Sequence, residues 1–362
     1  MTALTHIQIE PTTRCNFTCS FCCGRYMEQS DLEFAQFEQI LAAAPELQHL
    51  ELQGEGESLM HPRFFEMVAA ARARGVRVSL ISNGSYLTSA AIAQILELGI
   101  EKISISLESA DPVTFRHIRG GKLEKVVRGV EELMAARRAR GLRKPVVAFS
   151  ITVLKDTQDH LGGILALYRK LGLDGGITLQ PLQSMPGYVQ NYPAALSQQL
   201  LSDGEVNDLW IQFYAHRDIK KIQREKKATG VHGFFDELMA GFRPGSRRCP
   251  WLESGLYVNN KGVATGCCMI KDTAQFALGR FGVDSPAELL ARREALRQEL
   301  LQGAIPRACT GCELARFAVM TRLELLLFAL RGLWRRWSPW ARWQRRLQAS
   351  RQRPRISLPL SQ

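Results

Sequence analysis

Cysteine is missing from the long central part of this 362-residue sequence, because no cysteine lies between Cys23 and Cys249. A disulfide scaffold would be shorter and denser in cysteine, so that class of protein is excluded. A secretory signal is missing as well, since the first residues show neither a basic start nor an apolar segment. We therefore expect a cytoplasmic protein whose reduced thiols hold metal.

Positive charge is scarce outside the C-terminal tail. The formal net charge is +12, and residues 313–362 hold eleven arginines, no lysine and two acids, a balance of +9. The remaining +3 is ordinary for a body of this size. Because the basic charge is confined to the tail, we expect no nucleic-acid partner.

The tail has no uncharged apolar run long enough to span a bilayer, because Glu324 and Arg331 interrupt its most apolar stretch. Arginines alternate with four tryptophans, which predicts a basic amphipathic helix. Three roles stay open: binding at an anionic membrane surface such as the inner face of the membrane, packing on the protein itself, or docking an acidic partner. The tryptophans are Trp334, Trp337, Trp340 and Trp343.

The first half of the chain alternates short β-rich runs with helical patterns. Six such units predict a parallel sheet with right-handed crossovers, too few for a closed eight-fold barrel. The expected fold is α/β, an open partial (β/α)6 barrel with its chemistry at the C-terminal ends of the strands. The expected strands are Ile7–Glu10, Leu47–Leu52, Val76–Ser82, Lys102–Leu107, Val146–Val153 and Gly176–Gln180.

Composition divides the chain into four predicted parts. Residues 1–183 form the partial barrel, and residues 184–248 read as a helical connector or a substrate-facing insertion. Residues 249–312 form a small cysteine-rich domain that contains a hairpin, and residues 313–362 form the basic tail.

Three closely spaced cysteines follow the first expected strand. Cys15, Cys19 and Cys22, the first cysteine set, are spaced C-x3-C-x2-C. Three thiolates on one loop can converge on a four-iron cluster and leave one iron open to a small molecule. A zinc knuckle or unrelated core cysteines are the alternatives.

This spacing resembles the signature of the radical SAM superfamily, in which the open iron binds the amine and carboxylate of S-adenosylmethionine (SAM). The resemblance implies that Phe21 packs on the adenine. After the second expected strand, Glu55-Gly56-Glu57 is similar to the family's Gly-Gly-Glu motif, which binds the SAM amino group, although Glu55 and Ser58 depart from it. A solvated acidic turn is the alternative.

Two further strand ends extend the resemblance. Asn83-Gly84 is similar to the family's Thr-Asn-Gly segment, although Asn-Gly is also common in plain turns. The segments around Ser106 and Arg119 resemble the "Ser-Leu-Asp … Ile-Arg-Gly" stretch of members that carry auxiliary clusters. The resemblance implies that Ser106 and Arg119 contact the ribose or carboxylate of SAM.

Four later cysteines, the second cysteine set, are predicted to converge. They are Cys249, Cys267, Cys309 and Cys312. A predicted hairpin over residues 256–265 joins the first two, and the helical stretch 285–302 returns the C-x2-C pair. The arrangement resembles the C-terminal SPASM extension in its short "twitch" form, which implies one auxiliary [4Fe–4S] cluster. A structural zinc site is the alternative. Cys23 and Cys268 are small buried fillers, spare ligands or substrate-facing thiols.

The resemblance implies an oxidoreductase-type radical SAM enzyme that cleaves SAM reductively to a 5′-deoxyadenosyl radical. An auxiliary cluster without an open site suits oxidation of the substrate, by dehydrogenation or cross-linking. The implied partners are a reductant such as flavodoxin or ferredoxin, and a peptide, protein or small metabolite as substrate. The alternative is a non-enzymatic iron–sulfur or zinc protein that transfers electrons or binds partners. Candidate proton acceptors are Asp156, Asp159, Tyr188 and His216.

Overall fold

The computed structural model describes residues 3–337. Residues up to Val319 form one compact unit, and residues from Met320 onward form a second. The predicted four-part division of the chain is not tested by this partition and stays a prediction.

Six parallel strands build the core of the first unit, as the sequence predicts. All neighbouring pairs from β1 to β6 are parallel, in the order of the chain. The partial barrel is therefore confirmed. The strands are β1 (His6–Ile9), β2 (His49–Leu52), β3 (Arg77–Ser82), β4 (Lys102–Ser106), β5 (Val146–Val153) and β6 (Ile177–Pro181).

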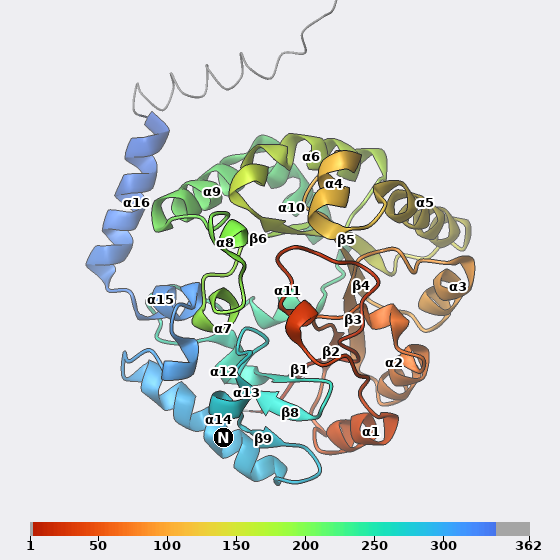
Figure 1. Ribbon diagram of the computed structural model, residues 1–362, viewed down its shortest axis with the longest axis horizontal. Coiled ribbons are helices and arrows are strands. Elements are labelled where there is room, and N and C mark those ends of the chain that lie inside the picture. The colour runs from red at the N-terminus through yellow and green to blue at the C-terminus, as the bar shows by residue number, and fades with distance from the viewer. Residues whose placement is uncertain (1–2, 338–362) are drawn as a thin grey trace, which may run out of the picture. The chain divides into compact units, whose positions relative to one another are not determined.

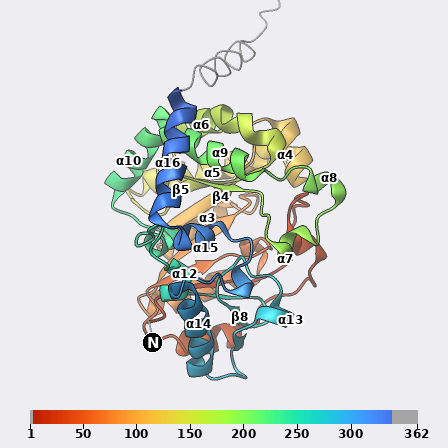
Figure 2. The same ribbon diagram turned by 90° about the vertical axis from the view of Figure 1, so that its left-hand side faces the viewer.

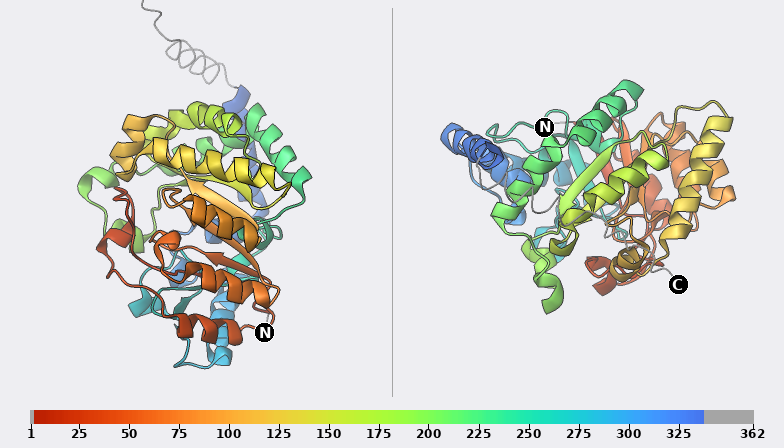
Figure 3. Two further views of the ribbon diagram at one scale, coloured as in Figure 1. Left: turned by 90° about the vertical axis from the view of Figure 1, so that its right-hand side faces the viewer. Right: turned by 90° about the horizontal axis from the view of Figure 1, so that it is seen from above.

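Helices connect consecutive strands and cover the outer face of the curved sheet (Figure 1). The left view of Figure 3 looks onto this layer, in which α1, α2, α3 and α5 follow one another along the sheet. The helices are α1 (Phe34–Ala42), α2 (Phe64–Ala73), α3 (Ser89–Glu97), α4 (Pro112–Arg119), α5 (Leu123–Ala139) and α6 (Leu161–Lys170). Four 3-10 turns accompany them: η1 (Cys23–Tyr26), η2 (Ser58–Met60), η3 (Lys155–His160) and η4 (Arg307–Cys309).

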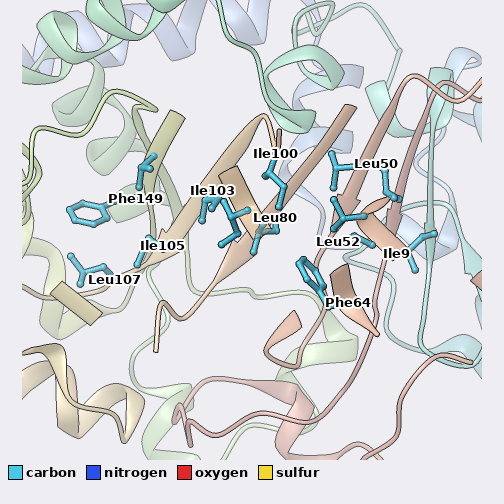
Figure 4. Close-up of a cluster of buried hydrophobic side chains, with 14 of the residues drawn as sticks. Ile9, Leu50, Leu52, Phe64, Leu80, Ile100, Ile103, Ile105, Leu107 and Phe149 are labelled. Atoms are coloured by element: carbon cyan, nitrogen blue, oxygen red, sulfur yellow. The ribbon is translucent and has the colours of Figure 1, made fainter. Parts of the chain in front are cut away.

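The strands are rich in apolar side chains because a parallel sheet is covered on both faces. Figure 4 shows this core, in which Leu50, Leu52, Leu80 and Ile103 are completely buried. Truncating one such leucine to alanine costs about 2–5 kcal/mol in typical cores. The rigid sheet fixes the positions of the loops that leave its C-terminal edge.

The predicted hairpin is present, and it extends the same sheet. Strand β7 (Gly255–Val258) pairs in parallel with β1, and β8 (Val263–Thr265) pairs antiparallel with β7. A short β9 (Gly279–Arg280) completes a nine-stranded sheet in the order β6-β5-β4-β3-β2-β1-β7-β8-β9. The hairpin turn needs Gly262, whose φ is +76°. The region of the second cysteine set is thus joined to the first strand through backbone hydrogen bonds.

The connector region is helical, as expected, but it holds more helices than the sequence predicts. Helix α10 was not predicted because eleven of its thirteen residues are polar, charged or small, and only Ile219 and Ile222 are buried. The segment α7 lies beside the chain between β8 and α13 (Figure 2). The helices are α7 (Pro186–Val189), α8 (Ala194–Ser197), α9 (Asp203–Ala215), α10 (Arg217–Thr229) and α11 (Phe234–Leu238).

Three helices accompany the hairpin, and two lie in the described part of the tail. They are α12 (Pro250–Ser254), α13 (Thr273–Phe276), α14 (Pro286–Leu301), α15 (Glu313–Val319) and α16 (Arg322–Trp337). Helix α16 agrees with the helix predicted for the tail, whereas Trp340 and Trp343 lie outside the described residues. Among residues 3–337, no helix has both the length and the apolar character needed to cross a membrane.

Candidate active site and metal centres

The first cysteine set lies on the loop that leaves β1, at the C-terminal edge of the sheet. The end of α4 holds this loop, because Thr18 N donates to Arg119 O (3.0 Å) and Ser20 N donates to Ile118 O (2.9 Å). Gly120 makes this contact possible: its φ is +71°, and a Cβ there would lie 2.1 Å from Thr18 Oγ1. The loop is therefore fixed between β1 and α4.

The sulfurs of this set are surrounded by donors that suit thiolates. Asn83 Nδ2 lies 3.7 Å from Cys15 Sγ, and Arg119 Nη1 lies 3.7 Å from Cys19 Sγ. Burial raises the pKa of Cys19 to about 11, and burial also raises the pKa of Cys22. These thiols become thiolates only with a strong cationic partner, and metal ions supply one. The donor set fits an iron–sulfur cluster.

No three His, Cys, Asp or Glu side chains in the described part of the chain are placed to share a single metal ion. A four-iron cluster makes a different demand, because each of its thiolates binds a separate iron. The two kinds of site therefore place their ligands at different separations.

Glu57 lies beside the first cysteine set and is almost completely buried. Its carboxylate accepts hydrogen bonds from Asn83 N (2.6 Å), Ser82 Oγ (2.8 Å) and Leu59 N (3.3 Å). Burial nevertheless raises the pKa of this carboxyl group. The structure thus brings together three segments that the sequence analysis singled out at three strand ends.

Gly56 permits this approach, because a Cβ at that position would lie 2.2 Å from Thr12 O. The next residue continues the contact, since Glu57 N donates to Arg14 O (2.8 Å). Because glycine has no Cβ, it is the only residue that fits here between the two loops without a shift of the backbone.

Arg119 is bound by a residue that the sequence analysis did not select. Its guanidinium and the Glu108 carboxylate form a bidentate ion pair, with Nη2 donating to Oε1 at 2.6 Å and Nε donating to Oε2. Both side chains are buried. Burial opposes the charge of Arg119, but Glu108 outweighs it and raises the pKa of the guanidinium. A contact between Arg119 and SAM stays a prediction, and the structure shows what positions the side chain.

Phe21 and Ser106 complete the predicted SAM-binding residues. Phe21 is half-buried, and its ring centroid lies 5.7 Å from the Arg119 guanidinium carbon. Ser106 is the last residue of β4 and is also half-buried. Ser106 thus lies at the C-terminal edge of the sheet, the edge from which the loop with Phe21 also leaves. Their predicted contacts with SAM stay predictions.

The second cysteine set converges in one apolar cluster, as the sequence predicts. Its four members pack with Phe234, Trp251, Leu252 and Leu300. Burial raises the pKa of Cys267 well above its usual range, and the other three members and Cys268 raise it further, which requires all of them to be near. Burial also raises the pKa of Cys249 to about 11. The donor set fits a cluster with four protein thiolates.

A small apolar cluster joins Cys23, which follows the first cysteine set, to Cys312 of the second set. Cys23, Met185 and Tyr188 are its buried members, and Met269 and Cys312 pack against it. Of the four candidate proton acceptors, only Tyr188 belongs to this cluster. Asp156 instead pairs with Gln199, and His216 caps α10. The observed place of Cys23 agrees with a buried filler.

An ion pair that the sequence analysis missed connects the same two regions. Lys271 Nζ lies 2.7 Å from Glu55 Oε1, and the other oxygen, Glu55 Oε2, lies 3.5 Å from Cys22 Sγ. Glu55 N donates to the buried Glu10 Oε1 (2.6 Å). A lysine 216 residues from its partner leaves no local signal in the sequence. The departure of Glu55 from the Gly-Gly-Glu pattern was the available hint.

A cysteine loop at the edge of a partial barrel, with a buried acidic turn beside it, defines an enzyme that binds a cluster and a small cofactor. Residues 9–167 match the model of the Radical SAM superfamily. This part of the chain has the radical SAM core, and the protein is a radical SAM enzyme. This finding sets aside the alternative of a non-enzymatic electron carrier or zinc protein.

Two curated relatives and one solved structure show what the chain is similar to. It is 28% identical over 253 residues to the tungsten-containing aldehyde ferredoxin oxidoreductase cofactor-modifying protein of Pyrococcus furiosus, covering 66% of this chain and 68% of the relative. It is 28% identical over 170 residues to the PqqA peptide cyclase of Streptomyces rochei. The latter match covers 46% of this chain and 45% of the relative, so the chain spans less than half of that protein.

The solved structure is that of Streptococcus suis SuiB bound to S-adenosylmethionine. The TM-score is 0.62 at 12% identity, over 87% of this chain and 72% of the other. At this identity the likeness shows the fold alone.

Proposed function

We propose that this radical SAM enzyme oxidises its substrate at a carbon–hydrogen bond, by dehydrogenation or cross-linking, and that the second cysteine set holds an auxiliary [4Fe–4S] cluster. The observation that carries the proposal is the convergence of four cysteines in one apolar cluster, within the same compact unit as the first cysteine set. Four protein thiolates occupy every iron of a cubane. Such a cluster has no position for a substrate, so electron transfer is the role that fits it.

When bound, the first cluster and SAM supply one-electron chemistry: the sulfonium C–S bond breaks, and the 5′-deoxyadenosyl group removes a hydrogen atom from the substrate. One electron comes from a reductant such as flavodoxin or ferredoxin and leaves with methionine. An auxiliary cluster held by the second cysteine set would supply an acceptor for one substrate electron, and a base or water would take one proton. In total the substrate loses two electrons and two protons.

The chain's own residues hold these groups in place. The first cysteine set would bind one cluster, and Asn83 and Arg119 would donate hydrogen bonds to the cysteine sulfurs. Gly56 and Glu57 would bind the SAM amino group, and Ser106, Phe21 and Arg119 would contact the rest of SAM. Glu108 keeps the guanidinium of Arg119 in one orientation.

The substrate class is proposed from the relatives' names. One relative modifies a cofactor and another cyclises a peptide. Both a small metabolite and a peptide or protein therefore stay open as substrates. A membrane-surface role of the tail rests on its sequence and stays a prediction.

The first test is anaerobic reconstitution with iron and sulfide analysis and electron paramagnetic resonance (EPR). We expect about eight irons per chain, and one EPR signal that SAM perturbs. The variant with Cys309→Ala and Cys312→Ala should keep about four irons and the SAM-sensitive signal. Bound zinc in place of the second cluster would contradict the electron-acceptor role and leave the first site intact.

A further inference from the structure

The buried Glu55 carboxylate joins the two cysteine regions through its two oxygens. Oε2 lies 3.5 Å from Cys22 Sγ, and Oε1 lies 2.7 Å from Lys271 Nζ. Only 15% of the Glu55 side chain and 11% of the Lys271 side chain are exposed. Solvent therefore screens the attraction between the Glu55 and Lys271 charges less than it would at the protein surface.

Two further observations fix the position of Glu55. Its backbone N donates to the buried Glu10 Oε1 (2.6 Å). Gly24, which follows the first cysteine set, packs so closely that a Cβ there would lie 2.7 Å from Glu55 Cβ. The carboxylate is held against the cysteine loop and cannot swing away into solvent.

Lys271 is held as firmly from the other side. It follows the pair Cys267 and Cys268, and its ammonium lies 5.1 Å from the ring centroid of Tyr257 and 5.8 Å from that of Tyr188. These distances are within the range of cation–π attraction. The ammonium therefore has two aromatic neighbours and one carboxylate partner.

A cluster bound by Cys22 would change the balance of charge around Glu55. In the free protein the Cys22 thiol can donate to Glu55, but a thiolate bound to iron cannot. A carboxylate beside a cluster thiolate repels the electron that reduces the cluster. The only cation placed on this carboxylate within the described residues is Lys271.

We propose that Lys271 is a positioning residue through which the C-terminal cysteine segment supplies the counter-charge at the first cluster and raises its reduction potential. Glu55 is the link, since it touches Cys22 with one oxygen and Lys271 with the other. Reduction of the first cluster, which starts the reaction, then depends on the segment after Cys267 being packed in the correct position. This inference rests on the cluster of the proposed function but needs neither the substrate nor the auxiliary cluster.

The test is a redox titration of the reconstituted full chain, with the SAM-sensitive EPR signal identifying the first cluster. Lys271→Met leaves Glu55 uncompensated, so the reduction potential should fall. Glu55→Gln removes the repelling charge, so the potential should rise. The double variant should return close to the parent value, and Lys271→Arg should keep it.

The opposite signs separate this proposal from a purely structural role. If the ion pair served only to dock the two regions, both single variants would move the potential in the same direction or leave it unchanged, and the proposal would be overturned. A matched control is Lys261→Met, which breaks the exposed pair between Lys261 of the hairpin turn and Glu28 of the loop that carries the first cysteine set. It should leave the potential at the parent value.

The iron count separates failure of the inference from failure of the proposed function. A parent protein that binds no iron would sink both. Variants that bind the parent amount of iron but show unchanged potentials would overturn the inference alone.

Discussion

At the scale of single residues, the site is built from side chains that already satisfy one another. Glu57 accepts three hydrogen bonds, and Arg119 is paired with Glu108. Because these contacts already hold each group in one rotamer, ligand binding requires little reorganisation of the site. The first two predictions concern these two carboxylates.

Glu57→Gln should abolish tight SAM binding while the first cluster stays assembled. The amide nitrogen of glutamine would oppose the Asn83 N–H, and the charge that attracts the SAM amino group would be lost. Charged hydrogen bonds contribute about 1.5–3 kcal/mol, so SAM affinity should fall by about ten- to a hundredfold. Equilibrium dialysis with SAM and iron analysis of the same sample measure both effects. Unchanged affinity would refute the assignment of Glu57 to SAM.

Glu108→Gln should destabilise the fold, because it leaves the buried Arg119 without its carboxylate. Breaking a buried ion pair by removing one partner costs about 3–5 kcal/mol. The control Glu66→Gln breaks an exposed pair with Arg63, and should cost at most about 1 kcal/mol. Denaturant unfolding of both variants tests the difference. Equal losses for the two pairs would show that the buried Glu108–Arg119 pair stabilises the fold no more than an exposed pair does.

At the scale of elements, β1 and β2 carry an uncharged histidine pair. His6 and His49 are opposite each other in register, and their rings stack with centroids 4.9 Å apart. Burial lowers the pKa of His6 to about 4 and that of His49 to about 3. Both rings are therefore neutral at neutral pH. They bind a proton only when the pH falls well below 6.5 or when unfolding exposes them to water.

The histidine pair predicts an acid-sensitive sheet. Because both pKa values are lower in the folded state than the usual 6.5, stability is complete above pH 6.5 and is lost as the pH falls toward 4. The loss should be on the order of 3 kcal/mol per ring. His49→Phe keeps an aromatic stack and removes one titrating group, so its unfolding free energy should depend less on pH between 7 and 5. Identical pH profiles for parent and variant would contradict this account.

The elements of the barrel could be predicted because their signals are local. Strand β5 begins and ends at the predicted residues, and helix ends fall at Gly75 and Gly99, whose φ values are positive. Helix α10 was missed because its sequence has few apolar residues. The parallel pairing of β7 with β1 was missed because pairing between strands 250 residues apart leaves no mark in either strand.

The contacts of the site also separate into those that the sequence could predict and those that it could not. The contact of Glu57 with Asn83 could be predicted, since both follow parallel strands whose C-terminal ends meet at one edge. The Glu108–Arg119 and Glu55–Lys271 pairs could not, because charge pairing depends on side-chain positions that only the folded chain sets. The sequence predicted which segments meet, and the structure shows which atoms do.

At the scale of the whole molecule, the cysteine-rich region behaves as part of the barrel's sheet. Strand β1 lies between β2 and β7, and all four of its residues are buried. Without β7 it would become a sheet edge with Ile7 and Ile9 uncovered. Exposed apolar edges promote aggregation. The sequence-based boundary between residues 248 and 249 therefore should not separate two independently folding pieces.

Truncation tests this view of the molecule. A chain ending at residue 248 should fail to fold as a soluble unit, because it lacks β7 and the apolar cluster of the second cysteine set, which includes Phe234 of the connector. A chain ending at residue 319 keeps the whole first compact unit and serves as the matched control. It should show one cooperative thermal transition and keep both cysteine sets. A soluble 1–248 chain with a SAM-sensitive EPR signal would show instead that the barrel is an autonomous domain. The hairpin would then be an attachment, and the charge link through Lys271 would be dispensable for assembly of the first cluster.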